Sequence, residues 1–579
     1  MNTGFPSHMS KVAGGALLLS LAACFGGGDD DDAPTPPPAG GARTLSEASC
    51  TAIGSRTYTN SPVFGASRWV ADGAEKAATT ATTALPAHCV VQGTIAPRTG
   101  ASGVPYGIQF ELRLPAAWNG RFFFQGGGGT DGSVSPATGI INSADGGNNV
   151  ALSQGYAVVS TDGGHQNSTL ATTAAFGADP QARIDWGYNA IDKTAVTAKS
   201  IIQGSYGAAP DKSYFLGCSN GGRQGMMFTQ RFPDAFDGVV AGAPVMDLGS
   251  ITAAEIWGLQ QFAKAAPRDS TGGIVWSQSF SPADRQLFTD AYVKACDATD
   301  GVADGMVQNP FACSFDPAVL QCTGAKNDTC WTPTQVAAVK ATVAGPITSS
   351  GGPVRVPGYS LPRETPVEGY VVDTGWMTPS GQPSRLIGTA TSLPGDFAFG
   401  AVQVPYLHIT PPDPTFDPLG INWDTYPNRM TIDPPWLSTR LDISAYKARG
   451  GKMIFYHGIS DPGPSVSNTI NYYNRLVQLN GGLTPTQAFA RLFMVPAMTH
   501  CSGGPSTDSF DPLTAIVNWV EKGVAPEQMV AKARAANASG LTSVKPAIPA
   551  DRTRPLCAYP KTAVYKAGNV EKAESFVCQ

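Results

Sequence analysis

The chain has 579 residues, a length that exceeds one ordinary domain and predicts a large core with a second domain or an insertion. Its 39 basic and 44 acidic residues give a net charge of −5, which offers no basis for nucleic-acid binding. An apolar content of 42% is that of a globular protein.

The first residues have the pattern of an export signal. Lys11 precedes the apolar run VAGGALLLSLAAC, which is too short to remain as a membrane-spanning helix. The run ends at a small-residue cleavage site, with Cys24 where bacterial lipoproteins are acylated. We expect a signal over residues 1–23, a flexible linker over 24–45, and an exported outer-membrane lipoprotein facing the periplasm or the cell surface. A plain secretory signal with an incidental Cys24 is the alternative.

Ten cysteines remain when Cys24 is set aside, and an even set is typical of disulfides in exported proteins. Spacing alone does not fix the connectivity, but proximity in the sequence suggests four pairs and leaves two cysteines for each other. The suggested pairs are Cys50–Cys89, Cys296–Cys313, Cys322–Cys330 and Cys557–Cys578, with Cys218–Cys501 as the remaining one.

Apolar strand-like runs alternate with helix-like runs over residues 46–246 and again over 441–579. This alternation predicts a mostly parallel sheet covered by helices on both faces. Residues 247–440 are instead rich in proline, glycine, threonine and aromatic residues, with weak periodicity. We therefore expect one α/β domain that is interrupted by a large inserted lid domain.

The pentapeptide GCSNG, residues 217–221, fits the G-x-S-x-G pattern of a nucleophile elbow. It follows the strand-like run SYFL and precedes a helix-like stretch, which is the context that an elbow requires. Ser219 is the expected nucleophile, with a serine in an ordinary glycine-rich loop as the alternative. Cys218 is a weaker candidate because the elbow exposes the central residue of the pentapeptide.

A serine hydroxyl needs a base to take its proton, and the base needs an acid to orient it. Asp461 and His500 each follow an expected strand, and the chain order Ser219, Asp461, His500 is that of an α/β-hydrolase. We expect these three residues to form a catalytic triad. The oxyanion hole would use the N–H groups of Asn220 and of Gly126 in QGGGG.

A second motif, CDATDGVADGMVQNPFAC, lies in the insertion. Asp297, Asp300 and Asp304 supply hard oxygen ligands at close spacing, which suits Ca²⁺. The backbone carbonyls of Val302 and Met306 could complete the shell. We expect a structural calcium site, with a solvated acidic turn as the alternative.

Several stretches resemble the tannase and feruloyl esterase family of α/β-hydrolases, from about residue 46 to the end. They are GCSNGGRQGMMFTQRFPDAFDGVVAGAP, DATDGVADG, YHGISD, RLFMVPAMTHCSGGP and VNWVEKGVAPEQM. The resemblance implies a lid inserted before the acid, a disulfide beside the triad, a calcium ion in the lid, and activity on esters of aromatic acids. By motif it carries over the triad, both cysteines beside it and the five calcium ligands named above.

We therefore expect an exported serine carboxylesterase that cleaves small aromatic esters of the feruloyl, galloyl or terephthalate-monoester type through an acyl-enzyme, without an organic cofactor. Trp257, Trp376, Phe397 and Phe399 are candidates to stack on the acyl ring. The resemblance also implies an arginine that grips a free substrate carboxylate, for which Arg385 is the candidate. A non-catalytic surface lipoprotein and a serine peptidase are the alternatives, and the sequence gives no oligomeric state.

Overall fold

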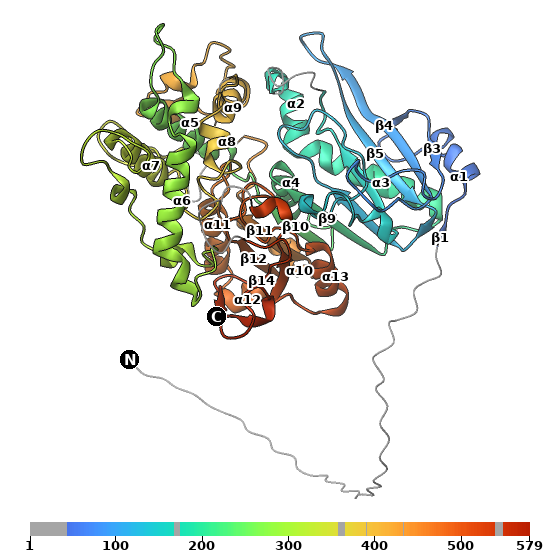
Figure 1. Cartoon of the computed structure of the whole chain (residues 1–579). Helices are drawn as coiled ribbons and strands as arrows, with labels where there is room; N and C mark the ends of the chain where they lie inside the picture. Colours follow the sequence, from blue (N-terminus) through green and yellow to red (C-terminus); the bar gives the residue numbers. More distant parts are fainter. Residues whose placement is uncertain (1–42, 167–173, 357–364, 390, 432–433, 539–547) are drawn as a thin grey trace, which may run out of the picture. The chain divides into compact units, whose positions relative to one another are not determined.

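The computed structural model describes residues 43–579 except 167–173, 357–364, 390, 432–433 and 539–547 (Figure 1). The expected signal, Cys24 and nearly all of the linker lie outside the described residues. Among the helices that are described, none combines the length and apolarity that crossing a bilayer requires.

A ten-stranded sheet runs in the order β12-β11-β10-β9-β7-β8-β5-β4-β2, with β3 also paired to β4. The six strands from β12 to β8 are parallel to their neighbours, and the rest are antiparallel. The strands are β2 Val63–Phe64, β3 Arg68–Val70, β4 His88–Thr99, β5 Pro105–Pro115, β7 Arg121–Gln125, β8 Ala157–Thr161, β9 Lys212–Cys218, β10 Gly238–Gly242, β11 Lys452–Gly458 and β12 Ala490–Val495. The expected parallel sheet is therefore present, with an antiparallel extension at one edge.

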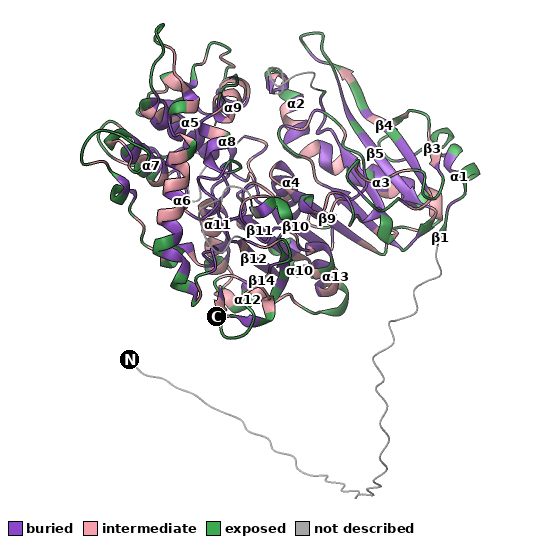
Figure 2. Cartoon of the chain, in the orientation of Figure 1, coloured by how far each residue is buried: buried purple, intermediate pink, exposed green. Residues whose placement is uncertain are grey.

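Side chains on the parallel strands alternate between two buried layers, because successive residues of a strand point to opposite faces. In β7, Phe122 and Phe124 join one core cluster and Phe123 joins the other. Residues of α3 Ala190–Tyr206, α4 Asn220–Arg231 and α11 Val466–Leu479 contribute to the first cluster, and residues of α13 Pro512–Lys522 to the second. Both faces of the sheet are therefore covered, as near-continuous apolar strands require. Figure 2 shows most of the length of the central strands in the colour of the buried class.

Residues 247–440 connect β10 to β11 and add no strand to the sheet within their described part. Their helices are α5 Leu248–Ala265, α6 Pro282–Cys296, α7 Pro333–Ala344, α8 Gln382–Leu386 and α9 Gly395–Gln403. These elements enclose a separate core that includes Trp257, Phe288, Trp331 and Trp376. Figure 1 shows α5 to α9 grouped on the side of the molecule away from β3, β4 and β5.

Three two-stranded ribbons and a few short helices complete the described chain. The ribbons are β1 Arg43–Thr44 with β6 Ala117–Trp118, β13 Gln528–Lys532 with β14 Thr553–Cys557, and β15 Ala563–Tyr565 with β16 Phe576–Cys578. The short helices are α1 Glu47–Thr51, α2 Pro180–Ile184, α10 Ser444–Ala448 and α12 Leu483–Gln487.

Five disulfides cross-link the chain, and they are the five pairs suggested by sequence proximity and elimination. Four of them close loops between residues 8 to 39 positions apart. Cys218–Cys501 instead joins residues 283 positions apart, with 6.0 Å between the Cα atoms. This bond ties the end of β9 to the loop that follows β12.

Candidate active site

The elbow is a sharp turn between β9, which ends at Cys218, and α4, which begins at Asn220. Ser219 between them has φ 64° and ψ −124°, a conformation that costs free energy for a residue with a Cβ. Its N–H donates to the Gly242 carbonyl at 3.0 Å, which helps to hold the turn. A Cβ at Gly217 would lie 2.6 Å from the backbone of Gly221, so the flanking glycines are a packing requirement.

The acid and the base follow neighbouring parallel strands. Asp461 comes after β11 and His500 comes after β12, and the two strands pair directly. His500 Nδ1 lies 2.7 Å from Asp461 Oδ2. The other carboxylate oxygen accepts the Gly463 N–H at 2.9 Å. The Asp461 carboxylate is therefore fixed on both oxygens and oriented toward the imidazole.

Asp461 is 2% exposed, and a second imidazole lies close to it, with His457 Nε2 at 3.3 Å from Oδ2. Burial by itself acts to raise the pKa of Asp461, but the charge of His500 and hydrogen bonds from both histidines outweigh it and hold that pKa well below its usual range. The carboxylate is therefore ionised at neutral pH, as the orienting acid of a triad must be.

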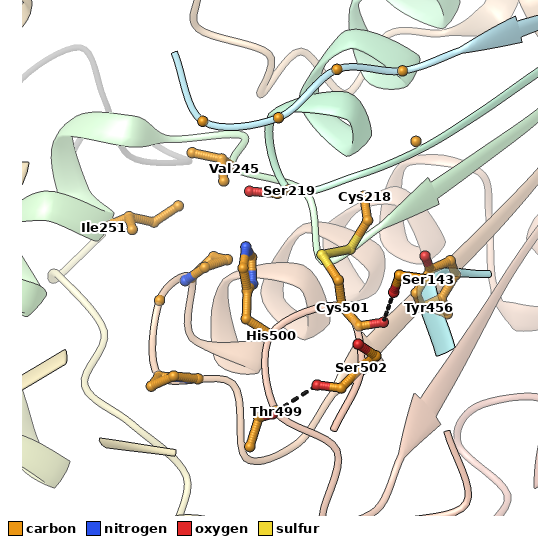
Figure 3. Close-up of a pocket in the computed structure, with 18 of the residues that line it drawn as sticks. Ser143, Cys218, Ser219, Val245, Ile251, Tyr456, Thr499, His500, Cys501 and Ser502 are labelled. Atoms are coloured by element: carbon orange, nitrogen blue, oxygen red, sulfur yellow. Dashed lines mark hydrogen bonds between the residues drawn. A yellow bond between two sulfur atoms is a disulfide. The ribbon is translucent and has the colours of Figure 1, made fainter. Parts of the chain in front are cut away.

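The nucleophile and the base meet in one pocket. Ser219 and His500 both line it, and their chain neighbours Cys218 and Cys501 are joined by the disulfide. Figure 3 shows the Ser219 hydroxyl and the His500 ring close to each other, with the disulfide beside them. The structure thus brings together the three residues that the sequence motif and chain order singled out.

The pocket has a volume of about 750 Å³, within the range of small-molecule sites. The α/β domain supplies the glycine loop 126–129, the elbow and the histidine loop to its wall. The insertion supplies Glu255, Arg385, Phe399 and Gln403, among others. A ligand in this pocket would therefore contact the insertion while its reacting group lies beside Ser219.

One of the two predicted oxyanion donors is wrong. The N–H of Gly126 already donates to the Leu216 carbonyl at 2.8 Å, because this glycine continues the pairing of β7 with β9. Gly127 N–H donates to the Gln224 side chain at 2.9 Å. Gly128 also lines the pocket, and its N–H has no hydrogen-bond partner among the described residues. Gly128 is therefore the better donor from this loop.

The predicted donor Asn220 lies at the first position of α4, where a helix leaves its N–H groups without an intrahelical partner. Its side chain is held in place, since Nδ2 donates to Asp131 and Oδ1 accepts from Arg223 Nε at 2.8 Å. Asp131 also accepts from Gln224 Nε2 at 2.9 Å. This buried network connects the elbow to the residues that follow the glycine loop.

Most of the predicted ring-stacking residues do not reach the pocket. Trp376 is fully buried against Phe288, with ring centroids 5.5 Å apart, and Trp257 belongs to the same insertion core. Phe397 is half-buried and packs on Trp276 at 6.4 Å between centroids. These three are corrected to core residues, because a lid with its own core needs large apolar side chains to fill it. Phe399 alone of the four lines the pocket.

Arg385 does line the pocket, but carboxylates of the protein already engage it. Its Nη2 lies 2.6 Å from Glu255 and its Nε lies 2.5 Å from Asp396. Sequence reasoning did not single out either acid. A signal for Glu255 was available, since it is the only acidic residue in the stretch that forms α5.

The acidic loop of the insertion is folded tightly on its own backbone. Asp297 Oδ2 accepts the Gly305 N–H at 2.8 Å, and Asp300 Oδ1 accepts the Val302 N–H at 3.2 Å. The second oxygen of each of these aspartates is buried without a hydrogen-bond partner in the described chain. Burial raises the pKa of Asp297 to about 6 and that of Asp300 to about 7. Two unpartnered carboxylate oxygens fit the oxygen chemistry of a hard cation.

Asp304, the third predicted carboxylate ligand, has protein partners instead. It pairs with Arg554 and lies 3.4 Å from Arg552, both fully buried. Its Oδ1 also accepts the N–H of Met306 at 3.1 Å. Within the described residues, the aspartates therefore do not converge as a preformed cluster of three acidic ligands.

The parallel sheet, the elbow serine, and an acid and a histidine after two later strands define an α/β-hydrolase. The model of the family described as tannase and feruloyl esterase matches residues 89–579. The chain belongs to this family, and it is an ester hydrolase of that group.

Individual relatives agree with this assignment. The chain is 43% identical over 536 residues to a mono(2-hydroxyethyl) terephthalate hydrolase of Piscinibacter sakaiensis, covering 86% of each chain. It is 30% identical over 441 residues to a probable feruloyl esterase B-2 of Aspergillus flavus, covering 72% of this chain and 76% of the relative. The crystal structure of feruloyl esterase B from Aspergillus oryzae aligns with a TM-score of 0.72 at 24% identity, covering 92% of this chain and all of that one. That likeness shows the fold.

Proposed function

We propose that this chain is an exported serine carboxylesterase that hydrolyses esters of aromatic acids through an acyl-enzyme. The observation that carries the proposal is that Ser219 and His500 line one pocket and that the buried Asp461 contacts His500. The Cys218–Cys501 disulfide holds the first two together, and a 2.7 Å contact joins the last two.

The reaction begins when His500 takes the proton of Ser219 Oγ as that oxygen attacks the ester carbonyl carbon. Asp461 accepts from the Nδ1–H of His500, which leaves Nε2 free to act as the base and stabilises the imidazolium that forms. The N–H groups of Asn220 and Gly128 hold the oxyanion. The alcohol leaves with the proton from His500, and water then cleaves the acyl-enzyme by the same steps.

Two features support an aromatic acid as the acyl group. The relatives reported above are named as a terephthalate monoester hydrolase and a probable feruloyl esterase, and the substrates in both names are esters of aromatic acids. In this chain the pocket offers Phe399 together with aliphatic side chains such as Ile140, Val245 and Ile251 to an apolar ring.

The decisive experiment compares wild type with Ser219→Ala on mono(2-hydroxyethyl) terephthalate, methyl ferulate and methyl gallate. We expect kcat to fall by about 10⁴-fold or more, because the nucleophile is lost. Ser502→Ala changes another serine of the same pocket and serves as the control, for which kcat should stay near the wild-type value. Equal rates for wild type and Ser219→Ala would leave only a binding protein on a hydrolase fold. Faster cleavage of matched anilides than of esters would indicate a peptidase.

We also propose that the acidic loop of the insertion binds a structural Ca²⁺, with Asp297 and Asp300 as its carboxylate ligands and with carbonyls such as that of Val302 completing the shell. Bound calcium would relieve the desolvation of two buried carboxylates and stabilise the folded state by mass action. Chelation with EGTA should therefore lower the Tm, and added Ca²⁺ should restore it. The double variant Asp297→Asn, Asp300→Asn should no longer respond to the chelator, and a wild type that ignores the chelator would exclude the site.

Export is supported by the five disulfides, which suit an oxidising compartment. Lipid attachment at Cys24 is a proposal that rests on the sequence of the signal. Mass spectrometry of the mature protein from the membrane fraction tests it. A diacylglyceryl modification on Cys24, absent from Cys24→Ser, is expected, and an unmodified mature chain released from the membrane would contradict it.

A further inference from the structure

A charged cluster forms part of the pocket wall on the side of the insertion. Arg385 of α8 lies between Glu255 of α5 and Asp396 of α9, at 2.6 Å and 2.5 Å respectively. Its guanidinium also lies over the ring of Phe399, 4.7 Å from the centroid. The arginine side chain is 22% exposed, Glu255 is 7% exposed and Asp396 is fully buried. The pocket wall therefore contains a partly accessible arginine that is already paired with two carboxylates of the protein, those of Glu255 and Asp396.

The geometry leaves the arginine poorly able to grip a ligand anion. Arginine binds a carboxylate best through two parallel N–H bonds from one edge of the guanidinium. The edge formed by Nε and Nη2 is the one that Asp396 and Glu255 occupy. A substrate carboxylate that bound this edge would have to displace a buried acid, which would then be left without its partner. At the other edge of the guanidinium, Nη2 is already paired with Glu255 and only Nη1 is left for a second bond.

The charge balance gives the same result whether the two acids hold no proton or one proton between them. With both acids ionised, two carboxylates face one guanidinium and the net charge is −1. Burial raises the pKa of both Glu255 and Asp396, while the charge of Arg385 acts to lower both; with one proton bound between the two acids the net charge is zero. In neither form does the cluster offer an uncompensated positive charge to an anion.

The cluster also adjoins the triad, where another negative charge is fixed. An atom placed as a Cβ on Gly463 would lie 3.8 Å from Glu255 Oε1, 3.9 Å from His500 Nδ1 and 3.4 Å from Asp461 Oδ1. A second carboxylate on a bound substrate would therefore be repelled by the nearby Glu255 and, from farther away, by the negative charge of Asp461. A neutral hydrogen-bond donor could instead pair with a carboxylate oxygen of Glu255.

We propose that Glu255 and Asp396 close Arg385 to substrate anions, so that the pocket selects esters of aromatic acids that carry no second free carboxylate. This inference rests on the proposed esterase function and assigns Glu255 as a specificity-determining residue of that site. It distinguishes this chain from an enzyme that would use the same arginine as a carboxylate clamp.

The proposal is tested with dimethyl terephthalate and monomethyl terephthalate. The two compounds have the same ring and the same cleavable methyl ester, but the opposite substituent is a neutral ester in the first and a free carboxylate in the second. Each kcat/KM is divided by the rate constant for hydroxide-catalysed hydrolysis of the same ester, which removes the difference in intrinsic reactivity. We expect wild type to favour the dimethyl ester by about tenfold or more, because juxtaposed like charges disfavour binding.

Glu255→Gln keeps the shape of the side chain and removes its charge. We expect it to raise the ratio of monomethyl to dimethyl activity by about tenfold, since Arg385 loses one of its two counter-charges. Glu521→Gln is the matched control, because Glu521 also pairs with an arginine, Arg121 at 2.6 Å, but does not line the pocket. Its ratio should equal that of wild type.

Asp396→Asn provides a second variant if Glu255→Gln does not fold, and it should move the ratio in the same direction. The proposal is overturned if wild type prefers the monomethyl ester. It is also overturned if the folded variants keep the wild-type ratio.

p-Nitrophenyl acetate separates the failure of this inference from that of the proposed function. A wild type that cleaves neither this ester nor the terephthalates would overturn the esterase itself. A wild type that cleaves p-nitrophenyl acetate and both terephthalates without discrimination would overturn only the role of the cluster.

Discussion

The α/β domain and the insertion place their functional side chains in different ways. In the α/β domain, Ser219, Asp461 and His500 each follow a parallel strand, so the sheet brings their ends to one edge. The insertion has no such sheet within its described residues, and its pocket residues come from helices α5, α8 and α9 and from Ser380 in the turn before α8. Catalytic residues at strand ends can therefore be predicted from their order in the chain. The pocket residues of a lid with its own core cannot be predicted in this way.

The two regions also differ in how their buried charged side chains are paired. The acid of the triad faces two imidazoles and is anchored by a backbone N–H. In the insertion, Arg385 is shared by two acids, and Asp304 is shared by two arginines. The buried charges of the insertion are thus paired with one another or, for Asp304, with arginines of the α/β domain, while the charges of the triad face a reacting group.

The largest expected effect tests the catalytic half of this comparison. Asp461→Asn should lower kcat by about 10⁴-fold, because the imidazole would lose its orienting carboxylate and take the wrong tautomer. Asp316→Asn, an exposed change in the insertion, should leave kcat near wild type. Steady-state kinetics on methyl ferulate measures both, and a small loss for Asp461→Asn would mean that another residue is the acid.

The disulfides allow a paired test of the two regions. Replacing Cys218 and Cys501 with alanine should reduce the free energy of unfolding by on the order of 5 kcal/mol on the loop-entropy model, and should also lower kcat as His500 loses its position. Removing Cys322–Cys330, which closes only 8 positions, should cost about 2–3 kcal/mol and spare kcat. Urea unfolding and kinetics distinguish the two. Equal losses of kcat in the two variants would show that the Cys218–Cys501 disulfide has no particular role in positioning His500.

Substitution of Trp376 tests whether this side chain stabilises the insertion core or contacts the substrate. Trp376→Ala should reduce the free energy of unfolding by about 3–5 kcal/mol through the cavity that it leaves. Phe399→Ala, at the pocket, should instead raise KM for aromatic esters with a smaller loss of stability. Thermal unfolding together with KM measurements would show the opposite pattern if Trp376 contacted substrate.

A pH-dependent effect on stability comes from the network behind the elbow. Burial raises the pKa of Asp131 from 3.8 to about 7, although Arg223 and Gln224 act to lower it. Between these values the folded state keeps a proton that the unfolded state has released. Stability should therefore fall as pH rises from about 4 to 7, by up to about 1.4 kcal/mol per pH unit.

Asp131→Asn should remove this contribution, which urea unfolding at several pH values in that range would detect. Asp316→Asn is again the control, because a hydrogen bond from Lys340 lowers the pKa of this exposed aspartate from 3.8, so it is ionised in both states over most of that range and should leave the slope unchanged. An unchanged slope in Asp131→Asn would show that Asp131 is ionised throughout the range.

The amino-acid sequence by itself determined the parallel sheet, the elbow at Ser219 and the chain order of acid and base. It could do so because buried strands, glycine turns and strand-end residues are set by local patterns of a few residues. Proximity and elimination among the cysteines also suggested the five disulfides that the structure forms.

Only the tertiary structure decided which backbone N–H groups stay free and which side chains line the pocket. Gly126 loses its N–H to a neighbouring strand, and Trp376 turns into the core of the insertion. Arg385 meets two acids that lie 130 and 11 positions away in the chain. Such outcomes depend on contacts between segments that are distant in the sequence, and no local pattern encodes them.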